Sequence, residues 1–253
     1  MQDEMERAAE SLHQWWADAG VEAEPLPPKP VTPAQPTAQT LTPKPASNLN
    51  AEARSAAAAC STLSELYTAI SNFNAGALSN GATQAVIARG NPKAEIMLIG
   101  EAPGREEDKA GKPFIGRSGQ FLDRMLASIG LDETSLYITN GVFWRPTGNR
   151  TPDQEETAMC LPFVERHIAL IAPKILITVG GSSTKTMLNT ETGITKLRGQ
   201  WASYTIKNPD GSATNTKIPL LPIYHPAFVL RKPIAKRDCW QDLLSLQGAL
   251  AER

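Results

Sequence analysis

Three apolar, strand-like runs each lead into a polar residue of a different kind. They end at Glu101, Asn140 and His225, which carry a carboxylate, an amide and an imidazole. In an open parallel sheet the ligand crevice lies outside the carboxyl ends of the strands, so three such ends can converge on one pocket. The sequence therefore predicts a site where an acid, an amide and an imidazole surround one ligand.

The loop after the first run, residues 100–116, combines glycines and prolines with an aromatic residue. Glycine lets backbone approach a ligand closely, and proline keeps the loop rigid. Phe114, between Pro113 and Gly116, is placed either to stack on a flat ring or to fill the core. The acidic residues at 106–108 are expected to form a solvated turn.

The loop after the second run, residues 140–152, begins with Asn140, whose amide offers a donor and an acceptor. This side chain either pairs with the amide or imide edge of a ligand or caps a turn. Asn149 either holds a water opposite Glu101 or ties the loop. Thr151 precedes a proline at a helix entry, and we expect it to act only as the helix cap.

The loop after the third run starts at His225, which ends a strand before a proline, whereas the other two histidines fall in helix patterns. Val229 and Leu230 are then followed by Arg231. Enzymes that act on a nucleobase take it out of the stack, and an inserted apolar side chain helps to open the gap. We expect Val229 and Leu230 to form an exposed wedge, with Arg231 as a phosphate anchor.

The elements that would position these loops alternate between strand and helix. We expect strands at 94–100, 136–139, 174–179, 200–206 and 217–224, and helices near 118–129, 153–170, 182–188 and 235–251. Such alternation implies a parallel sheet that is covered on both faces. The predicted fold class is α/β, a three-layer α/β/α sandwich with a mainly parallel central sheet.

The N-terminal part of the chain has a different composition. Eight of the 20 prolines fall between residues 25 and 45, so we expect a disordered linker there. Residues 5–19 fit a short amphipathic helix that docks either on the body or on a partner protein. We therefore divide the chain into a tail at 1–50 and a folded domain at 51–253, which opens with a helix from 51 to about 70.

Composition excludes several classes of protein. The 253 residues, 41% of them hydrophobic, can bury a substantial core. The chain has neither an apolar run long enough to span a bilayer nor an apolar segment behind a basic start, so we expect a soluble, cytoplasmic monomer without membrane contact. Cys60, Cys160 and Cys239 are too widely spaced for a disulfide framework or a Cys-x-x-Cys site. We expect reduced thiols, no metal and no cofactor.

Charge is distributed unevenly along the chain. Residues 1–50 carry seven acids and three bases, whereas the rest carries nineteen acids and twenty-two bases. Basic pairs at 231–232 and 236–237, with Lys196 and Arg198 in another loop, suit contacts to nucleic-acid phosphates. The alternative is that the basic pairs only solvate a helix start.

The three loops together resemble the uracil-DNA glycosylase superfamily, most closely its family 4. The resemblance rests on Gly100-Glu101-Ala102-Pro103-Gly104 through Phe114-Ile115-Gly116, on Ile138-Thr139-Asn140 through Gly148-Asn149-Arg150-Thr151-Pro152, and on His225-Pro226-Ala227-Phe228-Val229-Leu230-Arg231. It covers roughly residues 70–246. It implies a DNA-repair enzyme that hydrolyses the N-glycosidic bond of deoxyuridine in DNA, releases uracil and leaves an abasic site.

The resemblance also implies a role for each matching residue. Glu101 and Asn149 match positions associated with catalysis and with the attacking water, Phe114 the stacking aromatic, Asn140 the reader of the uracil edge, and His225 the group facing uracil O2. Cleavage builds negative charge on uracil and positive charge on the sugar. A neutral imidazole N–H would stabilise the first, and a carboxylate would stabilise the second and orient water.

Two positions in the first loop bear on water activation. Ala102 lies in the substrate-binding loop where the best-known family of the superfamily has an aspartate, although family 4 commonly has a small residue there. Glu107 is the reserve candidate for the carboxylate role. A non-catalytic binder of uracil-containing or abasic DNA is the alternative function, and an interaction adaptor built around the N-terminal tail is a third.

The chain departs from family 4 at the positions of an iron–sulfur cluster that many members hold with four cysteines. Only Cys160 matches, because residues 73–78 contain no cysteine and Trp144 occupies a third position. One thiolate cannot hold such a cluster, so we expect apolar packing by Phe73 and Trp144 in its place. The second loop also lacks the basic, histidine-containing insertion of a covalently trapping relative, so we expect turnover.

Overall fold

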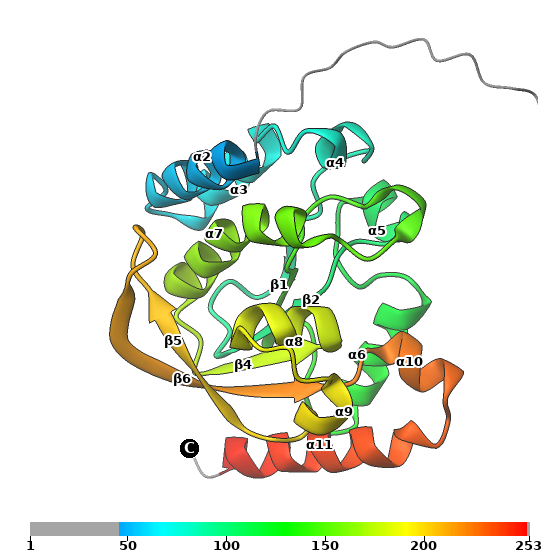
Figure 1. Ribbon diagram of the computed structural model, residues 1–253. Coiled ribbons are helices and arrows are strands. Elements are labelled where there is room, and N and C mark those ends of the chain that lie inside the picture. The colour runs from blue at the N-terminus through cyan, green and yellow to red at the C-terminus, as the bar shows by residue number, and fades with distance from the viewer. Residues whose placement is uncertain (1–45, 252–253) are drawn as a thin grey trace, which may run out of the picture. The chain divides into compact units, whose positions relative to one another are not determined.

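The computed structural model of the protein describes residues 46–251 (Figure 1). The predicted helix at 5–19 and the linker at 25–45 lie outside the described residues. Among the helices of the described part, none is both long enough and apolar enough to cross a membrane.

Within residues 46–251, the strands form one six-stranded sheet in the order β1-β3-β2-β4-β6-β5. The strands are β1 (Ala88–Gly90), β2 (Ile96–Gly100), β3 (Leu136–Asn140), β4 (Ile175–Val179), β5 (Ala202–Lys207) and β6 (Ala213–Ile223). The four central strands are parallel, and the edge strands β1 and β5 are antiparallel to their neighbours. The predicted mainly parallel sheet is confirmed.

Helices cover both faces of this sheet, as Figure 1 shows. Alternate side chains of β2 point to opposite faces: Met97 and Ile99 join one buried cluster, and Ile96 and Leu98 join the other. The first cluster includes residues of α2 (Ala46–Ala58), α3 (Leu63–Asn72), α7 (Gln154–Ile171) and α8 (Gly181–Leu188). The second includes residues of α6 (Arg117–Ala127) and α11 (Ala235–Ala251). The three-layer α/β/α arrangement is therefore confirmed, and strands buried on both faces explain the unbroken apolar runs.

One predicted helix is wrong. The segment from 51 to 70 forms two helices, α2 and α3, instead of one. Thr62 caps α3, because its hydroxyl accepts the Glu65 N–H while the Glu65 carboxylate accepts the Thr62 N–H. This capping box starts a new helix within the alanine-rich, helix-favouring run.

The short elements were not predicted from the sequence. These are β1, α4 (Ala77–Asn80), α5 (Arg105–Ala110), the 3-10 turn Thr147–Asn149, α9 (Ile194–Leu197) and α10 (Pro226–Arg231). Each is too short to show a periodic pattern, and three of them lie within the loops that the sequence marked as chemical.

Candidate active site

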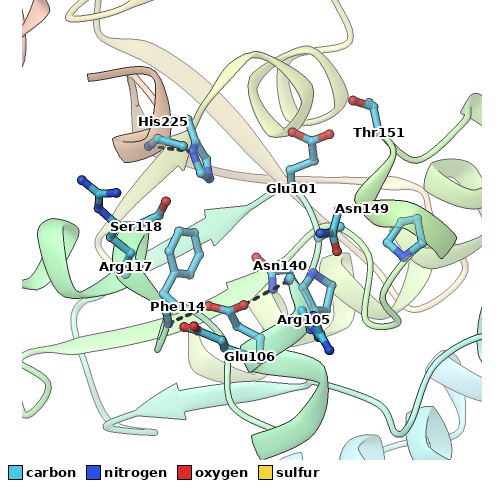
Figure 2. Close-up of a pocket in the computed structure, with 18 of the residues that line it drawn as sticks. Glu101, Arg105, Glu106, Phe114, Arg117, Ser118, Asn140, Asn149, Thr151 and His225 are labelled. Carbon is cyan, nitrogen blue, oxygen red and sulfur yellow. Dashed lines mark hydrogen bonds between the residues drawn. The ribbon is translucent and has the colours of Figure 1, made fainter. Parts of the chain in front are cut away.

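The three strand ends converge on one pocket of about 670 Å³ (Figure 2). The parallel register pairs Gly100 of β2 with Asn140 of β3, so the first and second loops leave the sheet side by side. The predicted site residues that line the pocket are Glu101, Ala102, Glu107, Phe114, Asn140, Asn149, His225 and Arg231. The structure thus brings together residues up to 130 positions apart.

Phe114 forms the aromatic wall of the pocket. Its side chain is 6% exposed, and its ring centroid lies 6.1 Å from that of His225. Its backbone adopts a left-handed conformation with φ of +54°, which is costly for a residue with a bulky side chain. The two predicted roles of Phe114, filling the core and offering a stacking surface, are both compatible with this position, because its ring packs into a buried cluster and also faces the pocket.

Gly100 makes the close approach of this wall possible. A Cβ atom at this position would lie 2.4 Å from Phe114 Cζ and 2.4 Å from Asn140 Oδ1. No side chain fits there without moving the ring or the amide. Asn140 is 2% exposed, and no described residue is a hydrogen-bond partner of its side-chain amide, which remains available to a ligand.

His225 is held in one tautomer by the backbone. It is the N-cap of α10, and its Nδ1 accepts a hydrogen bond of 3.2 Å from the Ala227 N–H. Because an acceptor nitrogen carries no proton, the neutral ring holds its proton on Nε2. Burial lowers the pKa of His225, and the nearby positive charge of Arg231 lowers it further, against a smaller raising effect of Glu107. His225 is therefore a neutral N–H donor at pH 7.

Glu101 follows β2 directly, and burial raises its pKa above the usual range for a carboxyl group. A hydrogen bond from the Thr151 side chain opposes that rise, and Figure 2 shows the Thr151 hydroxyl directed at the carboxylate. Thr151 is not the helix cap that the sequence predicted. Asp153 caps α7, since its carboxylate accepts the Glu156 N–H at 2.8 Å. The capping signal at 153 and 156 was present in the sequence.

Asn149 lies in the 3-10 turn with a left-handed φ of +56°. Its Oδ1 accepts a 2.6 Å hydrogen bond from Arg145 Nε. Since the guanidinium can only donate, this contact fixes the orientation of the amide and leaves its NH₂ group as a donor at the pocket. Asn149 therefore ties its loop and still has a group that can bind water.

Backbone N–H groups occupy both oxygens of the Glu107 carboxylate. Its two carboxylate oxygens accept hydrogen bonds from the N–H groups of Gly104, Ile115 and Gly116. This favours Glu101 over Glu107 as the carboxylate that faces a water.

The small side chain of Ala102 packs against the buried cluster and lines the pocket.

The structure corrects the predicted wedge. Val229 is fully buried at 0% exposure, because it packs with Tyr224, Ala235 and Cys239 beneath α10. It cannot be an exposed wedge. Leu230 is partly exposed, and Arg231 is exposed and lines the pocket.

Three arginines at the pocket were not predicted as site residues: Arg105, Arg117 and Arg150. They line it together with Arg231, so four arginines outnumber the three glutamates of the lining, Glu101, Glu106 and Glu107. Arg105 and Arg117 each follow a glycine N-cap, at the start of α5 and of α6. Paired Gly-Arg steps in a loop that leads to a helix were the signal that could have found them. A basic rim suits a polyanionic ligand.

The region of the family 4 iron–sulfur cluster is apolar here. The Phe73 ring lies 6.3 Å from Trp144 and 5.2 Å from Phe163, which confirms the predicted packing of Phe73 and Trp144. Cys160 is buried, and burial raises the pKa of its thiol to about 12, which disfavours the thiolate that a metal needs. Among residues 46–251 no three potential ligands of the Cys, His or carboxylate type come together. The residues present do not fit a cluster.

The fold and the pocket agree with the comparison to known families. Residues 87–244 match the model of the uracil DNA glycosylase superfamily. The chain belongs to this superfamily.

Individual relatives confirm the likeness to family 4. The chain is 40% identical to the type-4 uracil-DNA glycosylase of Sulfurisphaera tokodaii over 170 residues, which cover 65% of this chain and 74% of the relative. It is also 40% identical to that of Saccharolobus solfataricus over 174 residues, covering 67% and 77%. It is 34% identical to that of Pyrobaculum aerophilum over 195 residues, covering 76% and 96%.

Replacing Gly100 by alanine should disrupt the pocket. The added methyl group would displace the Phe114 ring or the Asn140 amide, and a shift of about 1 Å in such a group lowers kcat/KM by about 100-fold. Gly141→Ala is the matched control, because its Cβ would make only ordinary contacts of 3.5 and 3.6 Å. Equal glycosylase activity in the two variants would contradict this account of Gly100.

The pH dependence of the reaction should report on Thr151. We expect activity to require ionised Glu101 and therefore to be lost as the pH falls through the raised pKa of this group. Thr151→Val removes the hydrogen bond that lowers this pKa, and the acid limb of the kcat profile should move to higher pH. Thr151→Ser keeps the hydroxyl and should leave the limb in place. An unchanged limb in Thr151→Val would show that Glu101 does not set it.

Chelation should leave the protein intact. Aromatic side chains around Phe73 occupy the place of the cysteines that would hold an iron–sulfur cluster. We therefore expect no iron in the purified protein and an unchanged Tm after treatment with a chelator. Iron in stoichiometric amount, or a lower Tm after chelation, would contradict the fit described above.

Proposed function

We propose that this protein is a uracil-DNA glycosylase that hydrolyses the N-glycosidic bond of deoxyuridine and leaves an abasic site in DNA. One observation carries the proposal: a neutral His225 N–H donor, an aromatic wall, an unpaired amide and a buried carboxylate share one pocket. The names of the type-4 relatives support the same activity.

The pocket suits a flat base with an imide edge. Phe114 offers its ring as a stacking surface, and Asn140 beside it offers an acceptor and two donors. Uracil presents N3–H next to O4, so one amide can accept from the first and donate to the second. Cytosine presents an unprotonated N3 beside an amino group, and the same amide orientation would set donor against donor and acceptor against acceptor.

Bond cleavage separates charge, and the pocket has a group for each sign. As the glycosidic bond breaks, uracil becomes an anion, and His225 Nε2–H donates to its O2 without first losing or gaining a proton. The Glu101 carboxylate stabilises the cationic sugar and accepts a proton from the attacking water. The Asn149 NH₂ group donates to that water and orients it.

The first test uses duplex DNA with one uracil and measures free uracil and alkali-labile strand breaks. Wild type should release uracil in multiple turnovers, and Glu101→Gln should lower kcat by about 100-fold or more because the amide cannot accept the proton of water. Glu155→Gln on the exposed start of α7 is the matched control and should keep full activity.

The same assay separates the two functions. Tight binding of uracil-containing or abasic DNA by wild type without release of uracil would contradict the enzyme and favour the damage binder.

The turn between α10 and α11 supplies a different apolar residue for contact with DNA. Ile234 is the most exposed large apolar side chain among the described residues, at 85%. Basic pairs at 231–232 and 236–237 flank it, and backbone hydrogen bonds from Ala235 to Lys232 and from Lys236 to Pro233 fix the turn. We assign the wedge to Ile234 with partly exposed Leu230, and the phosphate contacts to the flanking bases.

This assignment predicts a duplex-specific effect. Ile234→Ala should lower kcat/KM about tenfold on double-stranded DNA, where the base must be unstacked, and have little effect on a single strand. Leu244→Ala, 44% exposed on α11 outside the turn, is the matched control. An equal loss on both substrates, or none on either, would contradict a wedge at Ile234.

Three further predictions from the sequence belong to this proposal. The enzyme acts as a monomer in the cytoplasm, and the N-terminal tail binds a separate protein. Deleting residues 1–45, which precede α2, should abolish that partnership and leave uracil release unchanged. Residues 46–50 are kept because they belong to α2, where the Asn50 side chain donates to the Ala158 carbonyl at 2.6 Å. Loss of release on this deletion would show that the tail takes part in catalysis.

A further inference from the structure

The strained turn at Phe114 is held by side chains from remote elements. Backbone strain of this kind persists only where the surrounding structure fixes it. Residues 113–116 belong to no helix or strand, so no regular ladder satisfies their polar groups. Groups from other parts of the fold must therefore hold the ring in place.

Glu107 holds the turn from one side. Its Oε1 accepts the N–H groups of Ile115 at 3.1 Å and Gly116 at 2.9 Å, and its Oε2 accepts the N–H of Gly104 at 3.1 Å. One carboxylate thus joins the two ends of the first loop. Three charge-assisted hydrogen bonds to backbone are strong and leave little freedom for the residues next to Phe114.

Arg89 of β1 holds the turn from the other side. Its Nε donates to the Pro113 carbonyl at 2.9 Å, and its Nη2 donates to the Phe114 carbonyl at 3.3 Å. The guanidinium is itself anchored by Asp123 of α6 at 2.5 Å. The Arg89 side chain is 7% exposed, whereas the Asp123 carboxylate that anchors it reaches solvent at 47%.

We propose that Glu107 and Arg89 are positioning residues that lock the Phe114 ring into the orientation in which it stacks on uracil. Glu107 secures the N–H groups after Phe114, and Arg89 secures the carbonyls before and at Phe114. The inference rests on the proposed function and adds to it the residues that preorganise base recognition. It gives Glu107 a part in binding instead of proton transfer.

The first test measures the affinity for free uracil in Glu107→Gln and Arg89→Lys. Glutamine brings an NH₂ group against backbone N–H groups, and lysine loses the fork that reaches two carbonyls. Both variants should bind uracil about tenfold more weakly, the scale of one lost base–aromatic stack, with a matching rise in KM. The acid limb of the kcat profile should stay in place, because Glu101 sets it.

Two results would overturn the proposal. A shifted acid limb with unchanged uracil affinity in Glu107→Gln would place this carboxylate in water activation. Unchanged uracil affinity in both variants would show that the ring does not depend on them. Wild type that binds uracil but releases none from DNA would contradict the proposed function alone, since the binding measurement requires no turnover.

A double-mutant cycle with Phe114→Ala guards against a general loss of folding. Once the ring is absent, adding Glu107→Gln or Arg89→Lys should change uracil affinity little further. Additive losses in the double variants would show that Glu107 and Arg89 act independently of the ring. The Tm of each variant shows that the compared proteins are folded.

Discussion

The close approach of three groups at the end of β2 determines the rest of the site. Gly100 pairs with Asn140 across the parallel register, and the absence of a side chain at Gly100 lets the Phe114 ring and the Asn140 amide meet over it. The side chains of β2 alternate between two buried clusters, and a slip of one residue would exchange the two sets and disturb the packing of both clusters. The core therefore sets the geometry of base recognition.

Electrostatics then divide the pocket into two halves. On one side burial and the positive charge of Arg231 keep His225 neutral. Because the Ala227 N–H donates to Nδ1, the imidazole proton is on Nε2 and can be donated to a ligand. On the other side burial raises the pKa of Glu101, which makes its carboxylate a better proton acceptor. A bound base would lie between a donor for its developing negative charge and an acceptor for the water that attacks the sugar.

The sequence predicted long elements and strand ends well because both leave local signals. Apolar runs and helical periods located the sheet, and the polar residue after each run located Glu101, Asn140 and His225. It failed where the answer depends on tertiary contacts. The local sequence does not show that Val229 is buried, because the burial comes from packing against Ala235 and Cys239. It also does not show that the Glu107 carboxylate is occupied, because the N–H groups that bind it come from residues 115 and 116 of the folded loop. Arg89 gave no signal, since its partners lie 24 or more residues away.

The most direct measurement is a crystal structure of Glu101→Gln bound to duplex DNA that contains deoxyuridine. We expect uracil turned out of the helix, stacked on Phe114, with its imide edge on the Asn140 amide and its O2 within about 3 Å of His225 Nε2. We also expect the Phe114 turn to keep its left-handed conformation, with φ near +54°. Uracil bound away from Phe114, or His225 turned from O2, would show that this pocket is not built in advance for the leaving base.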